Sequence, residues 1–98
     1  MIEATLHIGV LYVHFVIAAA QSLKDKRMVL KRLKDQVHNT FNVSVTELDH
    51  HDKWQRSTMA FCMINSDNRF IDGALNKVLQ FLEKYHTIEI TEHTIEFY

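Results

Sequence analysis

The sequence predicts an α+β fold with two helices on one face of an antiparallel four-stranded sheet. Four stretches have the residue pattern of strands, at about 6–17, 41–48, 54–64 and 87–97: the first is rich in β-branched and aromatic residues on both faces, and 41–48 alternates between apolar and polar residues. Apolar residues at helical spacing occur between them, at about 22–38 and 67–85. The order β-α-β-β-α-β is that of the ferredoxin-like fold. With 98 residues, the chain is long enough for one such domain, spanning 1–98.

The first predicted strand, 6–17, is apolar on both of its faces. The face toward the helices is expected to carry Leu11, Val13, Phe15 and Ile17. The opposite face is expected to carry Val10, Tyr12, His14 and Val16. Because no helix covers this second face, we expect it to be open and to contact a second copy of the chain. A platform for stacking bases at Tyr12 and His14 is the alternative.

The run 8–20 also resembles a secretory signal peptide, but its flanks do not fit one. No Lys or Arg precedes it, since the first basic residue is Lys24, and it is too short to cross a bilayer as a helix. The single cysteine, Cys62, cannot form an internal disulfide, and its apolar surroundings predict a buried thiol. We therefore expect a cytoplasmic protein without a membrane partner.

The first helix begins at Ser22, whose hydroxyl can cap the first turn. Six of the eleven basic residues lie within 22–35, and we expect all of them to project into solvent: Lys24, Lys26, Arg27, Lys31, Arg32 and Lys34. Such a cluster of cations suits the phosphates of a nucleic acid, and Arg56 is a possible addition. The alternative is an ordinary solvated helix face, partly neutralised by Asp25 and Asp35.

The second half of the chain contains residues that predict a helix cap, a bulge in the last strand and a cross-strand ion pair. The stretch Asn65-Ser66-Asp67 is expected to cap the second helix. In the last strand the apolar residues move from even to odd positions, which predicts a bulge near Glu92-His93. Glu47 and Arg56 flank the hairpin between the two middle strands and could form a cross-strand ion pair. We expect Trp54 beside them to be a packing anchor.

The hairpin itself contains the most metal-like stretch of the chain, Asp49-His50-His51-Asp52. Adjacent histidines rarely point the same way, and the helical H-x-x-x-H spacing is absent. A remote histidine could still converge on them in space. We interpret the stretch as a solvated turn without a metal, and a small metal-dependent enzyme that uses His50 and His51 is the alternative.

No pattern of catalytic residues is present. The chain has no G-x-S-x-G, no P-loop and no glycine pattern for a dinucleotide, and its seven histidines are scattered. We therefore expect no enzymatic activity, no cofactor and no small-molecule substrate.

Three blocks of sequence resemble the YlxP-like family of small bacterial proteins of unknown function. They are AQSLKDKRMVLKRLKD, FNVSVTELD and KWQRSTM. The resemblance implies a ferredoxin-like fold, a bacterial cytosolic setting and genes close to those for translation initiation and ribosome-binding factors. It carries over no catalytic residue. The chain departs from the family in having Ala19-Ala20 where many relatives have Pro-Gly, which concerns only the path into the first helix.

These observations together predict a non-enzymatic accessory factor that contacts RNA or ribosomal particles through the basic helix. The sheet lacks the aromatic signature of RRM domains, so binding is expected to depend on charge and shape. A homodimer or other protein-interaction module that uses the open sheet face is the alternative, and the two functions are compatible.

Overall fold

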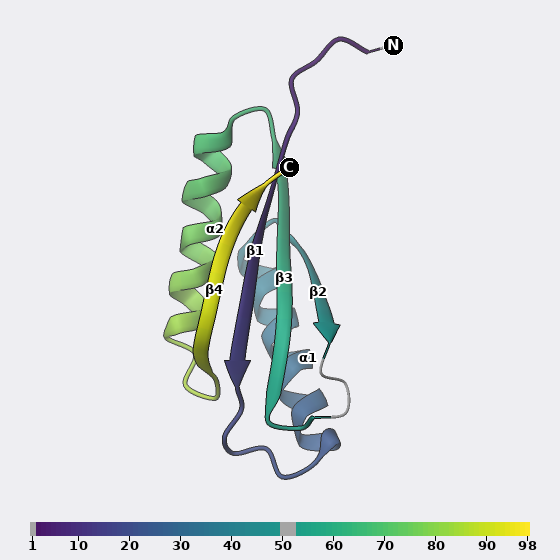
Figure 1. Cartoon of the computed structure of the whole chain (residues 1–98), viewed down its shortest axis with the longest axis vertical. Coiled ribbons are helices and arrows are strands. Elements are labelled where there is room, and N and C mark those ends of the chain that lie inside the picture. Colours follow the sequence, from purple (N-terminus) through teal and green to yellow (C-terminus); the bar gives the residue numbers. More distant parts are fainter. Residues whose placement is uncertain (1, 50–52) are drawn as a thin grey trace.

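The computed structural model describes residues 2–49 and 53–98 and has the predicted element order (Figure 1). In chain order, its strands and helices are β1 (His7–Val16), α1 (Leu23–Thr40), β2 (Ser44–Asp49), β3 (Arg56–Asn65), α2 (Asn68–Glu83) and β4 (Glu89–Phe97). The strands form one sheet in the order β2-β3-β1-β4, with every neighbouring pair antiparallel. The predicted ferredoxin-like α+β fold is therefore confirmed.

Both helices lie on the same side of the sheet, and its other side is open (Figure 1). Helix α2 packs against β1, β3 and β4, whereas α1 packs against β2. The covered side holds the core, in which Leu11, Val13 and Phe15 of β1 are at most 1% exposed. Burial of each such side chain stabilises the fold by about 1.5–3 kcal/mol. The predicted division of β1 into a covered and an open face is confirmed.

Each helix begins at a side-chain cap. The Ser22 Oγ accepts a hydrogen bond of 3.1 Å from the Asp25 amide, as the sequence predicted. The Asp67 carboxylate accepts one of 2.8 Å from the Arg69 amide, so Asp67 is the capping residue of the three that were proposed. Both caps satisfy amides that the first turn of a helix leaves without an intrahelical partner.

Glycine at position 9 lets α2 lie close to β1. A methyl group at Gly9 would clash with the side chain of Ile71 and would meet Leu75 at 3.3 Å. Any larger residue would therefore push α2 away from the sheet. Nothing lies within 4 Å of the corresponding position at Gly73, on the exposed side of α2.

Two irregularities in strand pairing decide which residues face each other. Between β1 and β4 the register shifts so that His14 pairs with Glu92 and Phe15 with Ile90, which leaves Thr91 as the bulged residue. This bulge lies one residue before the predicted position. Between β2 and β3 the register shifts after Glu47, and Glu47 pairs with Met59. The predicted Glu47–Arg56 pair is therefore wrong, because Glu47 lies on the covered side of the sheet and Arg56 pairs with Val16 on the open side.

Within the described part of the chain, neither helix is long and apolar enough to cross a membrane.

Candidate nucleic-acid interface

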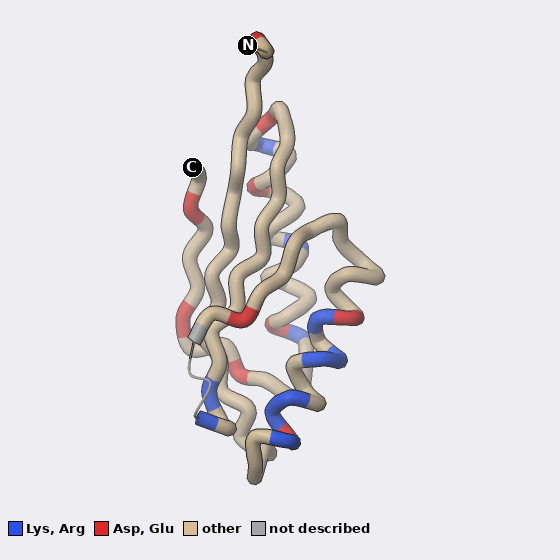
Figure 2. The backbone as a smooth tube through the Cα atoms, turned by 90° about the vertical axis from the view of Figure 1, so that its right-hand side faces the viewer, with Lys and Arg blue, Asp and Glu red and all other residues tan. Residues whose placement is uncertain are grey.

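The predicted basic residues of α1 separate into one exposed group and one buried side chain. Lys24, Arg27, Lys31 and Arg32 are exposed, and Lys34 is half-buried. We call these five residues the α1 basic surface. Figure 2 shows the blue segments following one another along α1, on the side of the helix layer away from β4. Three of the five, Arg27, Lys31 and Lys34, also line a pocket of about 340 Å³ between α1 and β2.

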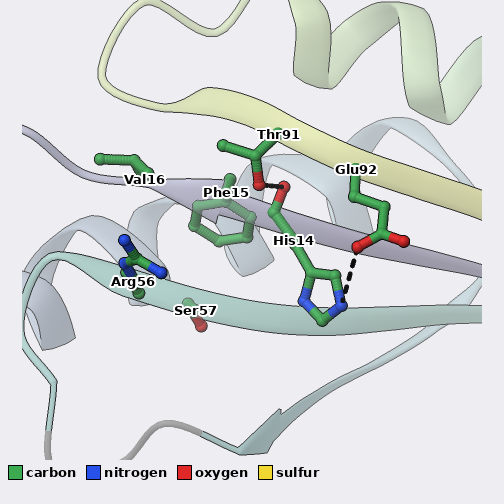
Figure 3. Close-up of a pocket in the computed structure, with 7 residues that line it drawn as sticks. All are labelled: His14, Phe15, Val16, Arg56, Ser57, Thr91 and Glu92. Atoms are coloured by element: carbon green, nitrogen blue, oxygen red, sulfur yellow. Dashed lines mark hydrogen bonds and ion pairs between the residues drawn. The ribbon is translucent and has the colours of Figure 1, made fainter.

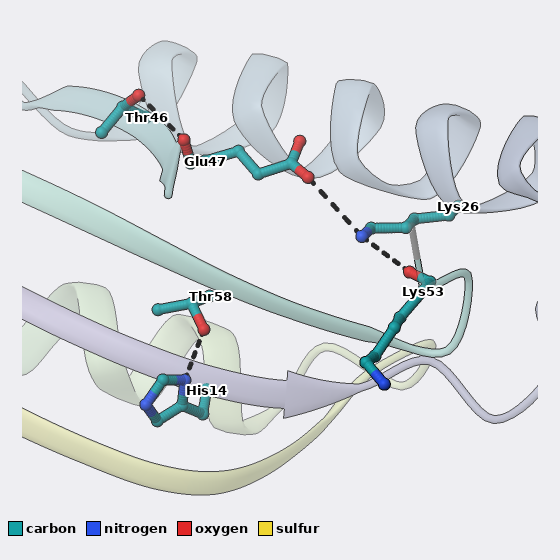
Figure 4. Close-up of polar contacts among 6 residues, drawn as sticks. All are labelled: His14, Lys26, Thr46, Glu47, Lys53 and Thr58. Carbon is teal, nitrogen blue, oxygen red and sulfur yellow. Dashed lines mark hydrogen bonds and ion pairs between the residues drawn. The ribbon is translucent and has the colours of Figure 1, made fainter. Parts of the chain in front are cut away.

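Lys26 is the exception, since only 2% of the residue is exposed. Its Nζ donates a hydrogen bond of 2.8 Å to the Lys53 carbonyl oxygen and lies 3.6 Å from Glu47 Oε1 (Figure 4). The expectation that Lys26 projects into solvent is therefore wrong. The reason was already present in the spacing, because Lys26 precedes Leu30 by four residues and so falls on the buried stripe of the helix.

Most of the α1 basic surface has no acidic partner among the side chains that the structure describes. Lys31 Nζ lies 3.4 Å from Asp35 Oδ2, but both side chains are more than half exposed, and such pairs contribute little. Among the side chains that the structure describes, those of residues 2–48 and 53–98, no acidic partner lies within ion-pair distance of Lys24, Arg27, Arg32 or Lys34. The surface therefore keeps a positive field that an anionic partner can neutralise.

A second group of cations lies at the start of β3, next to an exposed aromatic ring. Arg56 and Lys53 are both exposed, and with Trp54 and Gln55 they line a pocket of about 290 Å³. Trp54 is 46% exposed, so the expectation that it is a packing anchor is wrong. Lys53 was missed as a candidate, although its position beside a tryptophan and near Arg56 was a usable signal.

The open sheet face carries the predicted apolar residues, but its β4 edge is acidic. Val10, Tyr12, His14 and Val16 are half-buried there. Their neighbours on β4 are Glu96 opposite Val10, Glu92 opposite His14 and Glu89 opposite Val16. In Figure 2 red segments accordingly mark β4, the strand that leads to the C-terminus. This edge repels the phosphates of a nucleic acid, so the α1 side of the molecule is the better site for a polyanion.

Polar contacts connect the open face across three strands. Next to a pocket of about 460 Å³, His14 Nδ1 forms a hydrogen bond with Thr58 Oγ1, and His14 Nε2 lies 3.7 Å from Glu92 Oε1 (Figures 3 and 4). Thr58 is only 4% exposed, so its hydroxyl is not accessible as a nucleophile. We therefore interpret the His14 contacts as cross-strand links within the sheet.

Two tyrosines meet at the C-terminal end of this face. The Tyr12 and Tyr98 hydroxyls are 2.6 Å apart, and the Tyr98 hydroxyl donates a hydrogen bond of 2.8 Å to Glu96. The hydrogen bond with Tyr12, together with that to Glu96, raises the pKa of Tyr98 far above its usual value. At neutral pH the Tyr98 phenol is therefore protonated, and its hydrogen bond with Tyr12 ties the last residue of the chain to β1.

The structure describes only some of the remaining candidate residues. Cys62 pairs with Val10 on the open face and is half-buried, so the expectation of a buried thiol is wrong. No cluster of three or more His, Cys, Asp or Glu that could hold a metal ion occurs within the part of the chain that the structure describes. His50, His51 and Asp52 of the metal-like stretch lie outside the described residues.

Comparison with known proteins gives a family but no activity. Residues 8–95 match the family described as "Protein of unknown function (DUF503)". The chain is 40% identical over 76 residues to "Uncharacterized protein YlxP" of Bacillus subtilis (strain 168), which covers 78% of this chain and 83% of that protein. Among solved structures, the de novo designed protein Foldit4 is similar with a TM-score of 0.54 at 14% identity, covering 94% of this chain and 96% of the designed one. At this identity, the likeness to the designed protein concerns the fold alone.

Proposed function

This chain belongs to the DUF503 family of proteins of unknown function, and we propose that it is a non-enzymatic, cytosolic accessory factor that contacts RNA or ribosomal particles through the α1 basic surface. The observation that carries this proposal is the exposure of Lys24, Arg27 and Arg32 without an acidic partner among the described residues. Cations of this kind bind phosphates and release counterions, so the affinity falls as salt rises.

The distribution of charge supports the helix rather than the sheet as the binding surface. The α1 basic surface lies in the helix layer, whereas Glu89, Glu92 and Glu96 line one edge of the open sheet face. A ferredoxin-like domain that bound RNA on its sheet would bring the phosphates close to these carboxylates. Binding through α1 keeps the acidic edge on the opposite side of the molecule.

The test is a charge reversal that spares the buried lysine. The variant Lys24→Glu, Arg27→Glu and Lys31→Glu leaves Lys26 in place, so the fold keeps its buried ion pair. We expect wild-type protein to co-sediment with purified ribosomal particles in a salt-dependent way, and the variant to lose this binding. In filter binding to RNA, the slope of log K against log salt should fall in magnitude by about 2, since each lost phosphate contact removes about 0.7–0.9.

A matched control reverses the same number of charges on the other helix and just beyond its end. Arg69→Glu, Lys77→Glu and Lys84→Glu give the same net charge from exposed positions in α2 and at its C-terminal cap. This control should bind nearly as well as wild type. If both variants bind equally, or if the α1 variant still pellets normally at physiological salt, the proposal is wrong.

A second candidate function is self-association through the open sheet face. The observation that favours it is an apolar strip there, because Ile64 is 62% exposed and pairs with Ile8, next to half-buried Val10 and Tyr12. Such exposed apolar areas mark interaction surfaces. Light scattering tests it directly: a dimer that Tyr12→Ser converts to a monomer supports the function, and a monomeric wild type excludes it.

A further inference from the structure

We propose that Trp54 stacks on an unpaired base of single-stranded RNA, beside the α1 basic surface. This inference rests on the proposed function and adds the form of RNA that is bound. It starts from the exposure of Trp54, which differs sharply from that of the core aromatics. Trp54 is 46% exposed, whereas Phe15 and Phe61 are at most 1% exposed. An indole left in water next to cations is a binding surface rather than a part of the core.

Hydrogen bonds made by the residues on either side of Trp54 hold the chain in place there. Before it, the Lys53 carbonyl accepts the hydrogen bond of 2.8 Å from the buried Lys26 Nζ. After it, the Gln55 carbonyl accepts one of 2.8 Å from the Ile17 amide, and Gln55 Nε2 donates one of 3.2 Å to the Ala20 carbonyl. The indole therefore projects from a supported backbone, so little conformational freedom is lost there when a ligand binds.

The charges around Trp54 fit the phosphates on either side of a stacked base. Lys53 and Arg56 line the same pocket as the indole. The hydrogen bond between Lys26 and the Lys53 carbonyl also joins this segment to the first turns of α1, where Lys24 and Arg27 are exposed. Figure 2 shows blue segments at the start of β3 and in the first turns of α1 at the same end of the molecule. Aromatic rings combined with a basic track are how proteins bind single strands.

The exposed indole and the cations around it together indicate which form of RNA binds. In a duplex, the bases are stacked on one another and cannot reach an indole, whereas an unpaired base offers its face to it. The α1 basic surface can hold phosphates of either form. Trp54 therefore distinguishes single-stranded from double-stranded RNA, and the helix supplies the affinity that is common to both.

The single tryptophan makes the test direct, because all indole fluorescence comes from Trp54. The protein is titrated with a uridine oligomer of about 12 nucleotides, and with a duplex RNA of the same length, at several salt concentrations. We expect the oligomer to quench the fluorescence and the duplex to bind with little quenching. In Trp54→Ala, affinity for the oligomer should fall about tenfold while affinity for the duplex and the salt slope stay unchanged.

The outcomes separate the two proposals. The variant Trp54→Phe keeps a stacking ring and should recover part of the affinity for the oligomer, which a merely structural role at this exposed position would not predict. If the oligomer binds with unchanged fluorescence and Trp54→Ala binds it as tightly as wild type, the stacking site is wrong while binding through α1 stands. If neither RNA binds, both proposals are wrong.

Discussion

The two outer surfaces of this small domain have opposite charge, although they belong to one continuous fold. The helix side carries the α1 basic surface, whose exposed cations have few acidic partners among the described side chains. The open sheet face combines half-buried apolar residues of β1 with the glutamates of β4. The net charge of −1 hides this separation, because over the whole chain eleven basic residues are balanced by twelve acidic ones. A protein with almost no net charge can therefore still attract a polyanion on one side and repel it on the other.

Two ion pairs of α1 show how differently lysines of the same helix are used. Lys26 lies 3.6 Å from Glu47 and Lys31 lies 3.4 Å from Asp35, but the lysine side chains are 3% and 80% exposed. The buried lysine joins the helix to β2 and to the hairpin segment before β3. The exposed lysine contributes charge to the surface. Position on the helical stripe, rather than distance to the carboxylate, decides which function a lysine has.

The largest effect on stability is expected from the buried lysine. Lys26→Ala removes the ion pair with Glu47 and the hydrogen bond to the Lys53 carbonyl. We expect a loss of about 2–3 kcal/mol in the free energy of unfolding, somewhat less than for a fully buried pair because Glu47 is 26% exposed. Urea denaturation measures it. Lys31→Ala is the matched control and should change stability by less than about 0.5 kcal/mol. If the two variants lose equal stability, the buried and the exposed lysine do not differ in their contribution to the fold.

The next effect concerns the tight contact between α2 and the covered face of the sheet. Gly9→Ala places a methyl group against Ile71 and should destabilise the fold by about 1–3 kcal/mol. Gly73→Ala adds the same group on the exposed side of α2, where it meets nothing within 4 Å. There it should stabilise the helix by about 0.5–1 kcal/mol. Thermal unfolding of both variants compares the two positions. If Gly9→Ala unfolds at the wild-type temperature, α2 does not pack tightly against the sheet at Gly9.

The smallest effect that we expect is a loss of folding stability at high pH, caused by Tyr98 on the open sheet face. Because the pKa of Tyr98 is raised in the folded protein, the folded state keeps a proton that the unfolded state loses above its usual pKa of 10.0. The stabilising contribution of Tyr98 is therefore fully present below pH 10 and declines as the pH rises further. Tyrosinate absorbance should show one of the three tyrosines titrating late. Tyr98→Phe should abolish that late step, and its persistence in the variant would assign the raised pKa to another tyrosine.

Much of the fold was predictable because its signals are local. The β-branched and aromatic residues of β1, the cap at Ser22 and the shift from even to odd apolar positions in β4 are signals from residues a few places apart. The candidate surface was predictable only in part. Four of the six α1 cations are exposed as expected, and Lys34 is half-buried. The prediction for Lys26 was wrong because its place on the apolar stripe was given less weight than its charge.

The sequence by itself determined the order of the elements, the apolar faces and the concentration of cations in one helix, since each follows from periodicity or composition. The tertiary structure alone decided the ion-pair partner of Glu47, the exposure of Trp54 and the placing of the α1 cations and the β4 glutamates on opposite sides. These depend on strand register and on contacts between segments far apart in the chain. The bulge after Glu47 illustrates the reason, because one unpaired residue changes which side chains meet across the sheet.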